Sequence, residues 1–398
     1  MSLKKNLLVF LLLFQKIILS QSWVQITDFP SNNRDDGSAF VIGNKAFCGT
    51  GLQTGFIPSN DMYSFDMNTE TWSTINPLPA GARQYSASFS YTNSGFIFGG
   101  VNGSTYYNDL WMYDTVTGNW QAKTSLPSTG RMGTSCFVIN DTAYIIGGRT
   151  STTSSINEVW AYCTTPDTWT PKNNLPFGAR WRASATADNT KGYLIFGKDA
   201  TNRYCKELYE YDPLTSIWSQ ISTFPGNGRV YAAMKFISGD LIVLAGLDSL
   251  GNSYNDMWRI NTGLLAWQSL ASMPALGRRG GMCFNNNTTL YYTTGIDQTN
   301  NRLKETWKVF NPTSIIENNS QTSFNLYPNP TSKILYLESR SQNATFIITD
   351  LLGKELKSIE THNTKTEVGL SDFKNGIYFI REVIDEKIIS SNKFVIIK

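Results

Sequence analysis

The chain has 398 residues, a length that suggests two or three domains, and 41% of its residues are hydrophobic, which is ample for a large core. Its 34 basic residues nearly balance its 31 acidic ones, so the formal net charge is only +3. This balance provides no extended basic face, and we expect neither nucleic acid nor an anionic membrane surface as a partner.

The N-terminus has the pattern of a secretory signal peptide, which we assign to residues 1–22. Basic residues precede an apolar run between Leu7 and Leu19, and small or polar residues follow it. Polar residues interrupt this run, which is shorter than the roughly 20 apolar residues that span a bilayer. We therefore expect export and no transmembrane segment in the mature chain. Cleavage after Ser20 and cleavage after Ser22 both remain open.

A repeated unit occupies residues 23–312. Six tryptophans recur at intervals of 48 or 49 residues, and an arginine follows each of them eleven positions later. The tryptophans are Trp23, Trp72, Trp120, Trp169, Trp218 and Trp267, and the arginines are Arg34, Arg83, Arg131, Arg180, Arg229 and Arg278. A period near 50 residues is typical of a propeller blade with four strands.

The composition of each unit supports four strands. Short β-branched and aromatic runs alternate with Gly, Asn, Asp and Ser clusters, and no helical periodicity appears. A glycine and then an acidic residue recur in every unit. The glycines are Gly51, Gly100, Gly148, Gly197, Gly246 and Gly295, and the acidic residues are Asp61, Asp109, Glu158, Glu207, Asp256 and Glu305. We predict an all-β, six-bladed propeller.

The last unit lacks a tryptophan strand of its own, because the repeat ends at Asn311 and Pro312. The chain begins with such a strand at Trp23. We therefore expect the N-terminal strand to complete the sixth blade, which leaves no free sheet edge around the ring.

A polar linker at residues 313–323 and a small β domain at residues 324–398 are predicted after the repeats. The expected strands of this domain are Ile334–Glu338, Thr345–Thr349, Ile377–Val383 and Phe394–Ile397, which suit a compact sandwich.

The repeat resembles the kelch family of β-propellers over residues 23–312. The motifs that carry the resemblance are Phe98-Gly99-Gly100, Ile146-Gly147-Gly148, Asn108 to Asp114 and Asn255 to Trp258. Ala245 and Thr294 replace the first glycine in two units, and Lys198 follows Gly197. These departures weaken single repeats and leave the assignment unchanged.

The C-terminal segment resembles the type IX secretion C-terminal sorting domain. The matching steps are Leu326 to Thr331, Asp350 to Lys354, Gly376 to Phe379, and Lys393-Phe394. The resemblance implies export across a bacterial outer membrane by the type IX machinery, followed by surface display or release.

The glycine loops and the arginines are expected on one face, because alternate connections of an antiparallel blade emerge on the same side. That face is the candidate ligand-binding surface. Its predicted residues are Arg34, Arg83, Arg131, Arg180, Arg229 and Arg278, together with Arg149, Arg182, Tyr85, Trp181 and Tyr231. Guanidinium groups suit carboxylates and aromatic faces suit sugar rings. A structural role remains open, in which each repeat arginine bonds to backbone carbonyls or to an acidic residue.

Few catalytic groups are available to the propeller. The sole histidine, His362, lies in the C-terminal domain, so histidine metal ligands and Ser-His or Cys-His pairs are excluded from the repeats. The five cysteines are interpreted as isolated structural thiols. We expect neither a metal nor a cofactor.

A binding module for a glycan or a protein is the function we expect of this exported propeller. The alternative is a sugar-acid mutarotase similar to N-acetylneuraminate epimerases, a bacterial branch of kelch propellers that uses acidic and arginine residues without a metal. Across the six connections from tryptophan to arginine the acidic residue is Asp28 alone. That scarcity of carboxylates favours binding over catalysis.

Overall fold

The structure is a computed structural model that describes residues 22–312, 324–339, 343–350, 354–384 and 387–398. The expected signal peptide, apart from Ser22, and the expected linker lie outside these residues. The chain divides at residue 314 into two compact units, each of which is described by itself. Every regular element of the described residues is a strand, and none of them forms a helix that could cross a membrane.

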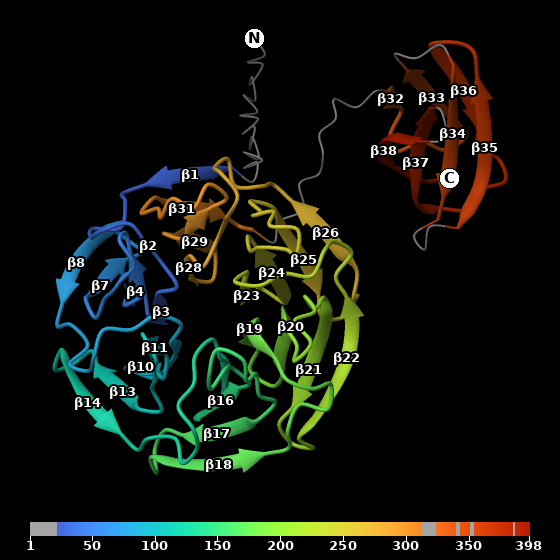
Figure 1. Cartoon of the computed structure of the whole chain (residues 1–398). Helices are drawn as coiled ribbons and strands as arrows, with labels where there is room; N and C mark the ends of the chain where they lie inside the picture. The colour runs from blue at the N-terminus through green and yellow to red at the C-terminus, as the bar shows by residue number, and fades with distance from the viewer. Residues whose placement is uncertain (1–21, 313–323, 340–342, 351–353, 385–386) are drawn as a thin grey trace, which may run out of the picture. The chain divides into compact units, whose positions relative to one another are not determined.

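Residues 22–312 form six antiparallel sheets of four strands around a ring (Figure 1), which confirms the propeller prediction. Blade 1 contains β3 (Ser38–Ile42), β4 (Lys45–Gly49), β7 (Met62–Asp66) and β8 (Thr71–Ile75). Blade 2 contains β9 (Ala87–Tyr91), β10 (Ser94–Phe98), β13 (Leu110–Asp114) and β14 (Asn119–Lys123). Blade 3 contains β15 (Ser135–Ile139), β16 (Thr142–Ile146), β17 (Val159–Cys163) and β18 (Thr168–Lys172).

The other three blades repeat this order. Blade 4 contains β19 (Trp181–Ala187), β20 (Gly192–Lys198), β21 (Glu207–Asp212) and β22 (Ile217–Thr223). Blade 5 contains β23 (Ala233–Ile237), β24 (Asp240–Leu244), β25 (Met257–Asn261) and β26 (Trp267–Leu270). Blade 6 contains β28 (Met282–Asn285), β29 (Thr289–Thr293), β31 (Thr306–Phe310) and β1 (Trp23–Ile26). Its outer strand therefore comes from the N-terminal end of the repeats.

Short strands extend the loops of one face. They are β2 (Arg34–Asp35), β5 (Leu52–Gln53), β6 (Ile57–Pro58), β11 (Val101–Asn102), β12 (Thr105–Tyr106), β27 (Arg278–Arg279) and β30 (Ile296–Asp297). These loops build the site described below.

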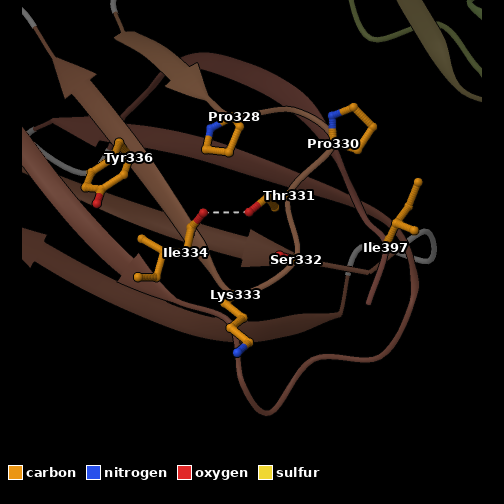
Figure 2. Close-up of a pocket in the computed structure, with 8 residues that line it drawn as sticks. All are labelled: Pro328, Pro330, Thr331, Ser332, Lys333, Ile334, Tyr336 and Ile397. Carbon is orange, nitrogen blue, oxygen red and sulfur yellow. Dashed lines mark hydrogen bonds between the residues drawn. The ribbon is translucent and has the colours of Figure 1, made fainter.

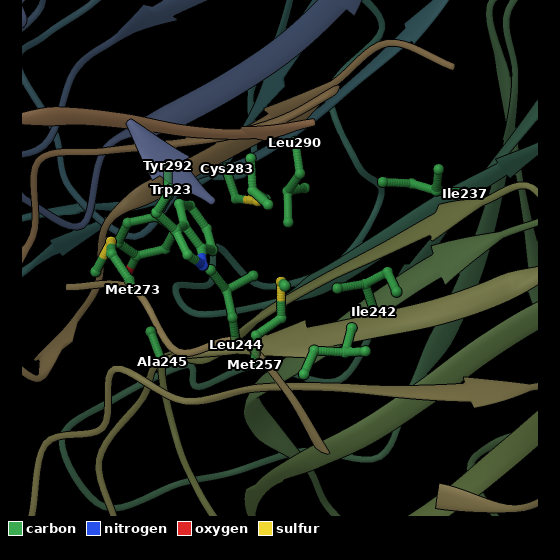
Figure 3. Close-up of a cluster of buried hydrophobic side chains, with 12 residues drawn as sticks. Trp23, Ile237, Ile242, Leu244, Ala245, Met257, Met273, Cys283, Leu290 and Tyr292 are labelled. Atoms are coloured by element: carbon green, nitrogen blue, oxygen red, sulfur yellow. The ribbon is translucent and has the colours of Figure 1, made fainter. Parts of the chain in front are cut away.

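Burial within a blade follows strand position. All five residues of β24 are buried, because blades pack on both faces of the second strand. The outer strand β8 is largely exposed and keeps its tryptophan half-buried. On β1, Trp23 packs into the cluster between blades 5 and 6 together with Leu244, Met273 and Tyr292 (Figure 3), and its indole donates to the Ala271 carbonyl at 2.8 Å.

The repeat glycines connect neighbouring blades. Each of the six has φ between 84° and 104°, a region that favours glycine, and its amide donates to the carbonyl of the next repeat arginine. Gly51 donates to Arg83 at 2.8 Å, and Gly295 closes the circle by donating to Arg34 at 2.8 Å. The recurring glycine is therefore explained by the positive φ that this hydrogen bond between blades requires.

The C-terminal unit is a sandwich of two sheets. One contains β32 (Phe324–Tyr327), β33 (Ile334–Ser339) and β36 (Lys365–Gly369), and the other contains β35 (Glu355–Thr361), β34 (Ala344–Thr349), β37 (Gly376–Ile384) and β38 (Lys387–Ile396). Leu335, Phe346, Ile380 and Phe394 lie in its core. Strands β32, β35 and β36 were not predicted, because the first is short and the other two are largely exposed.

Candidate functional site

The six repeat arginines lie in the interior and are 0–3% exposed. In five repeats the guanidinium pairs with the acidic residue of its own repeat. The pairs are Arg34–Asp61 at 2.5 Å, Arg83–Asp109 at 2.6 Å, Arg131–Glu158 at 2.8 Å, Arg229–Asp256 at 2.6 Å and Arg278–Glu305 at 2.8 Å. The expectation that these six guanidinium groups face a ligand is therefore wrong. Their role is structural, the alternative left open above.

The fourth repeat departs from this pattern. Arg180 contacts the Cys205 thiol, and its guanidinium lies 5.0 Å from the centre of the Phe177 ring. Glu207, which holds the acidic position, pairs instead with the half-exposed Arg203 at 2.7 Å. In this repeat the contacts of the arginine are therefore with a thiol and an aromatic ring in place of the carboxylate.

Six residues, each two positions after a repeat arginine, form a closed circle of backbone hydrogen bonds. They are Asp36, Tyr85, Gly133, Arg182, Tyr231 and Gly280, and we call them the central ring. Each has φ between 55° and 66°, and its amide donates to the carbonyl of the preceding member at 2.7–3.4 Å. One residue per blade is thereby fixed at the same level of the propeller, and four of the six carry a side chain.

Side chains of the central ring meet across the axis. The guanidinium of Arg182 lies 4.0 Å from the Tyr231 ring centre and 4.6 Å from that of Tyr85. The hydroxyls of Tyr85 and Tyr231, which belong to opposite blades, are 3.4 Å apart. A Cβ at Gly280 would lie 2.6 Å from the Asp36 carboxylate. The glycine positions therefore leave room for the side chains that cross the centre.

Two further predicted residues extend this stack. Trp181 is buried between two guanidinium groups, those of Arg149 at 3.9 Å and Arg182 at 4.0 Å. Burial lowers the pKa of both arginines below their usual value. The structure thus brings five of the predicted residues together through cation–π contacts. They are Tyr85, Arg149, Trp181, Arg182 and Tyr231.

A cavity of about 390 Å³ adjoins the central ring. It is lined by Asp35, Asp36, Leu52, Phe56, Tyr85, Tyr231, Arg279, Ile296, Asn300 and Arg302. The side chain of Phe56 is 77% exposed at this cavity and lies 4.8 Å from the Arg302 guanidinium. Acidic, basic, aromatic and amide groups therefore converge from the loops of blades 1, 2, 5 and 6.

The charged groups of the cavity differ in how far they are neutralised. Arg302 donates to Asp35 at 2.6 Å, and both side chains are 8% exposed. Burial, and then the Asp35 carboxylate, raise the pKa of Asp36 well above its usual value despite the opposing charge of Arg182. Arg279 donates to the Asn300 amide oxygen at 3.1 Å and pairs with no acidic side chain of the described residues.

Sequence reasoning missed Asp35 and Asp36. Two consecutive aspartates follow Arg34, where other repeats have pairs such as Gln84-Tyr85 and Val230-Tyr231. That contrast was the available signal. It lies directly after the arginine, whereas the acidic residues counted above were those in the connections before each arginine. No sequence pattern marked Asn300 and Arg302 as site residues, because they lie in the long loop between β30 and β31.

The cysteines are free thiols, and the described residues contain no group of three or more His, Cys, Asp or Glu side chains that could hold a metal. Burial raises the pKa of Cys136 to about 11 and that of Cys283 to about 12. These thiols stay protonated at neutral pH and pack as small apolar groups.

The sorting-domain unit has a cavity of its own, of about 370 Å³ (Figure 2). Pro328, Pro330 and Tyr336 line it, and Thr331 beside them donates its hydroxyl to the Ile334 carbonyl. Its lining includes one charged side chain, Lys333, so it provides little chemistry for a polar ligand.

Comparisons with known proteins agree with this architecture. A family model described as the Attractin/LZTR1 beta-propeller matches residues 46–246, about half of the chain, and one described as a secretion system C-terminal sorting domain matches residues 325–398. No curated protein matches the chain. A solved structure titled "Structure of YjhT" is similar, with a TM-score of 0.62 and 16% identity over 71% of this chain and 96% of that one. At this identity the similarity concerns the fold.

The C-terminal match also bears on location. A type IX sorting domain indicates secretion and localisation at the cell surface, and it implicates the type IX machinery as a partner. The predicted localisation is thereby confirmed.

Proposed function

We propose that this chain, which belongs to the Attractin/LZTR1 family of β-propellers, is a secreted binding module that holds a glycan beside the central ring. The observation that carries the proposal is the cavity of about 390 Å³, in which side chains from four blades converge. Small-ligand sites commonly have volumes of about 300–1,000 Å³. The cavity is therefore large enough for one or two sugar rings.

The lining groups suit a sugar. The exposed Phe56 ring offers a flat apolar face to the C–H groups of a pyranose. The Tyr85 and Tyr231 hydroxyls and the Asn300 amide supply donors and acceptors for sugar hydroxyls. This combination favours a glycan over a purely apolar ligand.

The charge of the cavity favours an acidic glycan. Arg302 is neutralised by Asp35, and burial raises the pKa of Asp36, which favours the uncharged form of this carboxyl group. Arg279 remains as the cation without an acidic partner among the described residues. A carboxylate or sulfate on the ligand would accept a charge-assisted hydrogen bond from the Arg279 guanidinium.

Replacing Arg279 by Gln is expected to weaken the binding of an acidic glycan about 10- to 100-fold, because a hydrogen bond to a charged group contributes about 1.5–3 kcal/mol. A glycan array with the purified full chain identifies the ligand, and isothermal titration calorimetry measures the affinity. Arg203→Gln, on a half-exposed arginine outside the cavity, is the matched control and is expected to keep wild-type affinity. Equal affinities of the two variants, or binding of neutral glycans alone, would contradict the proposal.

A sugar-acid mutarotase is the second candidate, and the adjacent carboxyl groups of Asp35 and Asp36 in the lining of the cavity favour it. Interconversion of anomers opens the ring: a base takes the proton of the anomeric hydroxyl, an acid protonates the ring oxygen, and the bond between the anomeric carbon and the ring oxygen breaks to give a carbonyl. Burial favours the protonated form of Asp36, which suits the role of the acid, and the neighbouring Asp35, which is paired with Arg302, is the carboxyl group for the base. Closure on the other face of the carbonyl gives the second anomer.

Asp36→Asn is expected to reduce such an activity about 100-fold, since a positioned general acid contributes factors of about 10² to 10⁴. NMR measures the rate of anomer interconversion of sialic acid with wild-type protein, with the variant and in buffer. A wild-type rate equal to that in buffer would exclude this candidate and leave the binding function standing.

A further inference from the structure

A second cavity, of about 180 Å³, lies at the centre of the ring of blades. We call the axial space inside the innermost strands of the six blades the central channel. Its lining consists of the six central-ring residues and the residue that follows each of them, so all six blades contribute. Asp36, Tyr85 and Tyr231 line both cavities, and the other nine residues of this lining do not line the glycan cavity.

Two polar atoms of this lining have no hydrogen-bond partner among the described residues. They are Nε of Arg182 and Oγ1 of Thr134, and both are inaccessible to solvent. A buried donor without a partner carries a desolvation penalty, and this penalty is larger for a charged group. Arg182 Nε can only donate, so its missing partner is an acceptor, and the Thr134 hydroxyl can donate to an acceptor as well.

The innermost strands of the six blades carry positive charge and no negative charge. β3, β9, β15, β19, β23 and β28 contain Arg182 and Lys235 but neither Asp nor Glu. The Lys235 ammonium influences the pKa of Cys136 on β15 and of Cys283 on β28, which belong to opposite blades. Lys235 therefore projects into the channel, where no described acidic side chain forms an ion pair with it.

Asp36 is the acidic residue of the central ring, and its negative charge would offset that of Arg182. Asp36 lies at the level of the central ring, but burial and its neighbour Asp35 favour its protonated form. Asp35 is already paired with Arg302. Water could accept the hydrogen bonds of Arg182 and Thr134, but it would leave two cations unbalanced in one channel.

We infer that the central channel binds a small inorganic anion of the size of chloride, which accepts hydrogen bonds from Arg182 Nε and Thr134 Oγ1. The positive charge of Lys235 adds an electrostatic potential that attracts an anion to the same channel. The low dielectric constant of the surrounding protein strengthens this potential. The test of this site is separate from that of the proposed function, because neither Thr134 nor Lys235 lines the glycan cavity.

Thermal unfolding of the purified full chain tests the site. At equal ionic strength the midpoint is expected to be higher in sodium chloride than in sodium methanesulfonate, whose anion is larger and carries an apolar methyl group, and to rise with chloride concentration. Thr134→Val and Lys235→Met are each expected to weaken chloride binding about tenfold, so that the same rise requires about tenfold more chloride. The unfolding midpoint of each variant in one salt is compared with its own midpoint in the other salt. A loss of stability from the substitution itself affects both midpoints and cancels in their difference.

Lys123→Met is the control, because Lys123 pairs with Asp167 at 3.5 Å on an outer strand and lies away from the channel. It is expected to show the wild-type response to chloride. Crystals grown in bromide should show an anomalous peak beside Arg182. Equal midpoints of the wild type in the two salts, an unchanged response in both channel variants, or a channel without a bromide peak would overturn the inference.

Discussion

Deletion of residues 23–30 is expected to lower the midpoint of thermal unfolding of the propeller by roughly 10 °C or more. The deletion removes β1, whose four residues pair in register with β31, and it takes Trp23 out of the cluster between blades 5 and 6. Loss of a buried tryptophan alone costs about 3–5 kcal/mol, and each kcal/mol moves the midpoint of a domain this large by about 2–4 °C. The exposed edge of β31 adds to the loss.

Differential scanning calorimetry measures this effect, and deletion of residues 324–398 is the control. The sorting domain forms a compact unit with its own core, so its loss is expected to leave the propeller transition in place. A propeller that melts at the wild-type temperature without residues 23–30 would contradict closure of blade 6 by β1.

Asp109→Ala is expected to lower the free energy of unfolding by about 3 kcal/mol or more, because it leaves the fully buried guanidinium of Arg83 without its carboxylate. The remaining contacts of Arg83, with the Gly99 carbonyl at 3.0 Å and the Tyr107 ring at 4.1 Å, do not neutralise the charge. Urea denaturation followed by tryptophan fluorescence gives the free energy.

Glu207→Ala is the matched control, since Glu207 occupies the same position of the fourth repeat. Its partner Arg203 is 54% exposed, and pairs between exposed side chains contribute about 0–1 kcal/mol. Similar losses at both positions would show that the buried ion pair does not stabilise its blade.

The sequence determined the fold of the propeller almost completely, because a repeat carries the same local signals six times. Tryptophan spacing predicted the blades, and the missing seventh tryptophan predicted how the ring closes. The sandwich was predicted with fewer strands than it has. Strands β35 and β36 bury few side chains, so no apolar alternation marks them.

The role of the repeat arginines could not be decided from the same pattern. An arginine that recurs with an acidic residue about 27 positions later is compatible with a ligand-binding face and with an internal ion pair. Burial decides between the two roles, and burial depends on how each blade packs against the next. The pattern fails at Arg180, because the acidic residue of its repeat, Glu207, is present in the sequence but pairs with Arg203.

The site itself was decided by tertiary structure. Tyr85 and Tyr231 are 146 positions apart in the chain, and their hydroxyls meet because the six blades bring opposite members of the central ring to one axis. Asp35 and Arg302 are 267 positions apart and pair because the last blade closes on the first. The sequence by itself determined the repeat, the blades and the closing strand, since these follow from local periodicity. Ring closure alone decided which side chains meet, since it sets distances between residues that no local pattern connects.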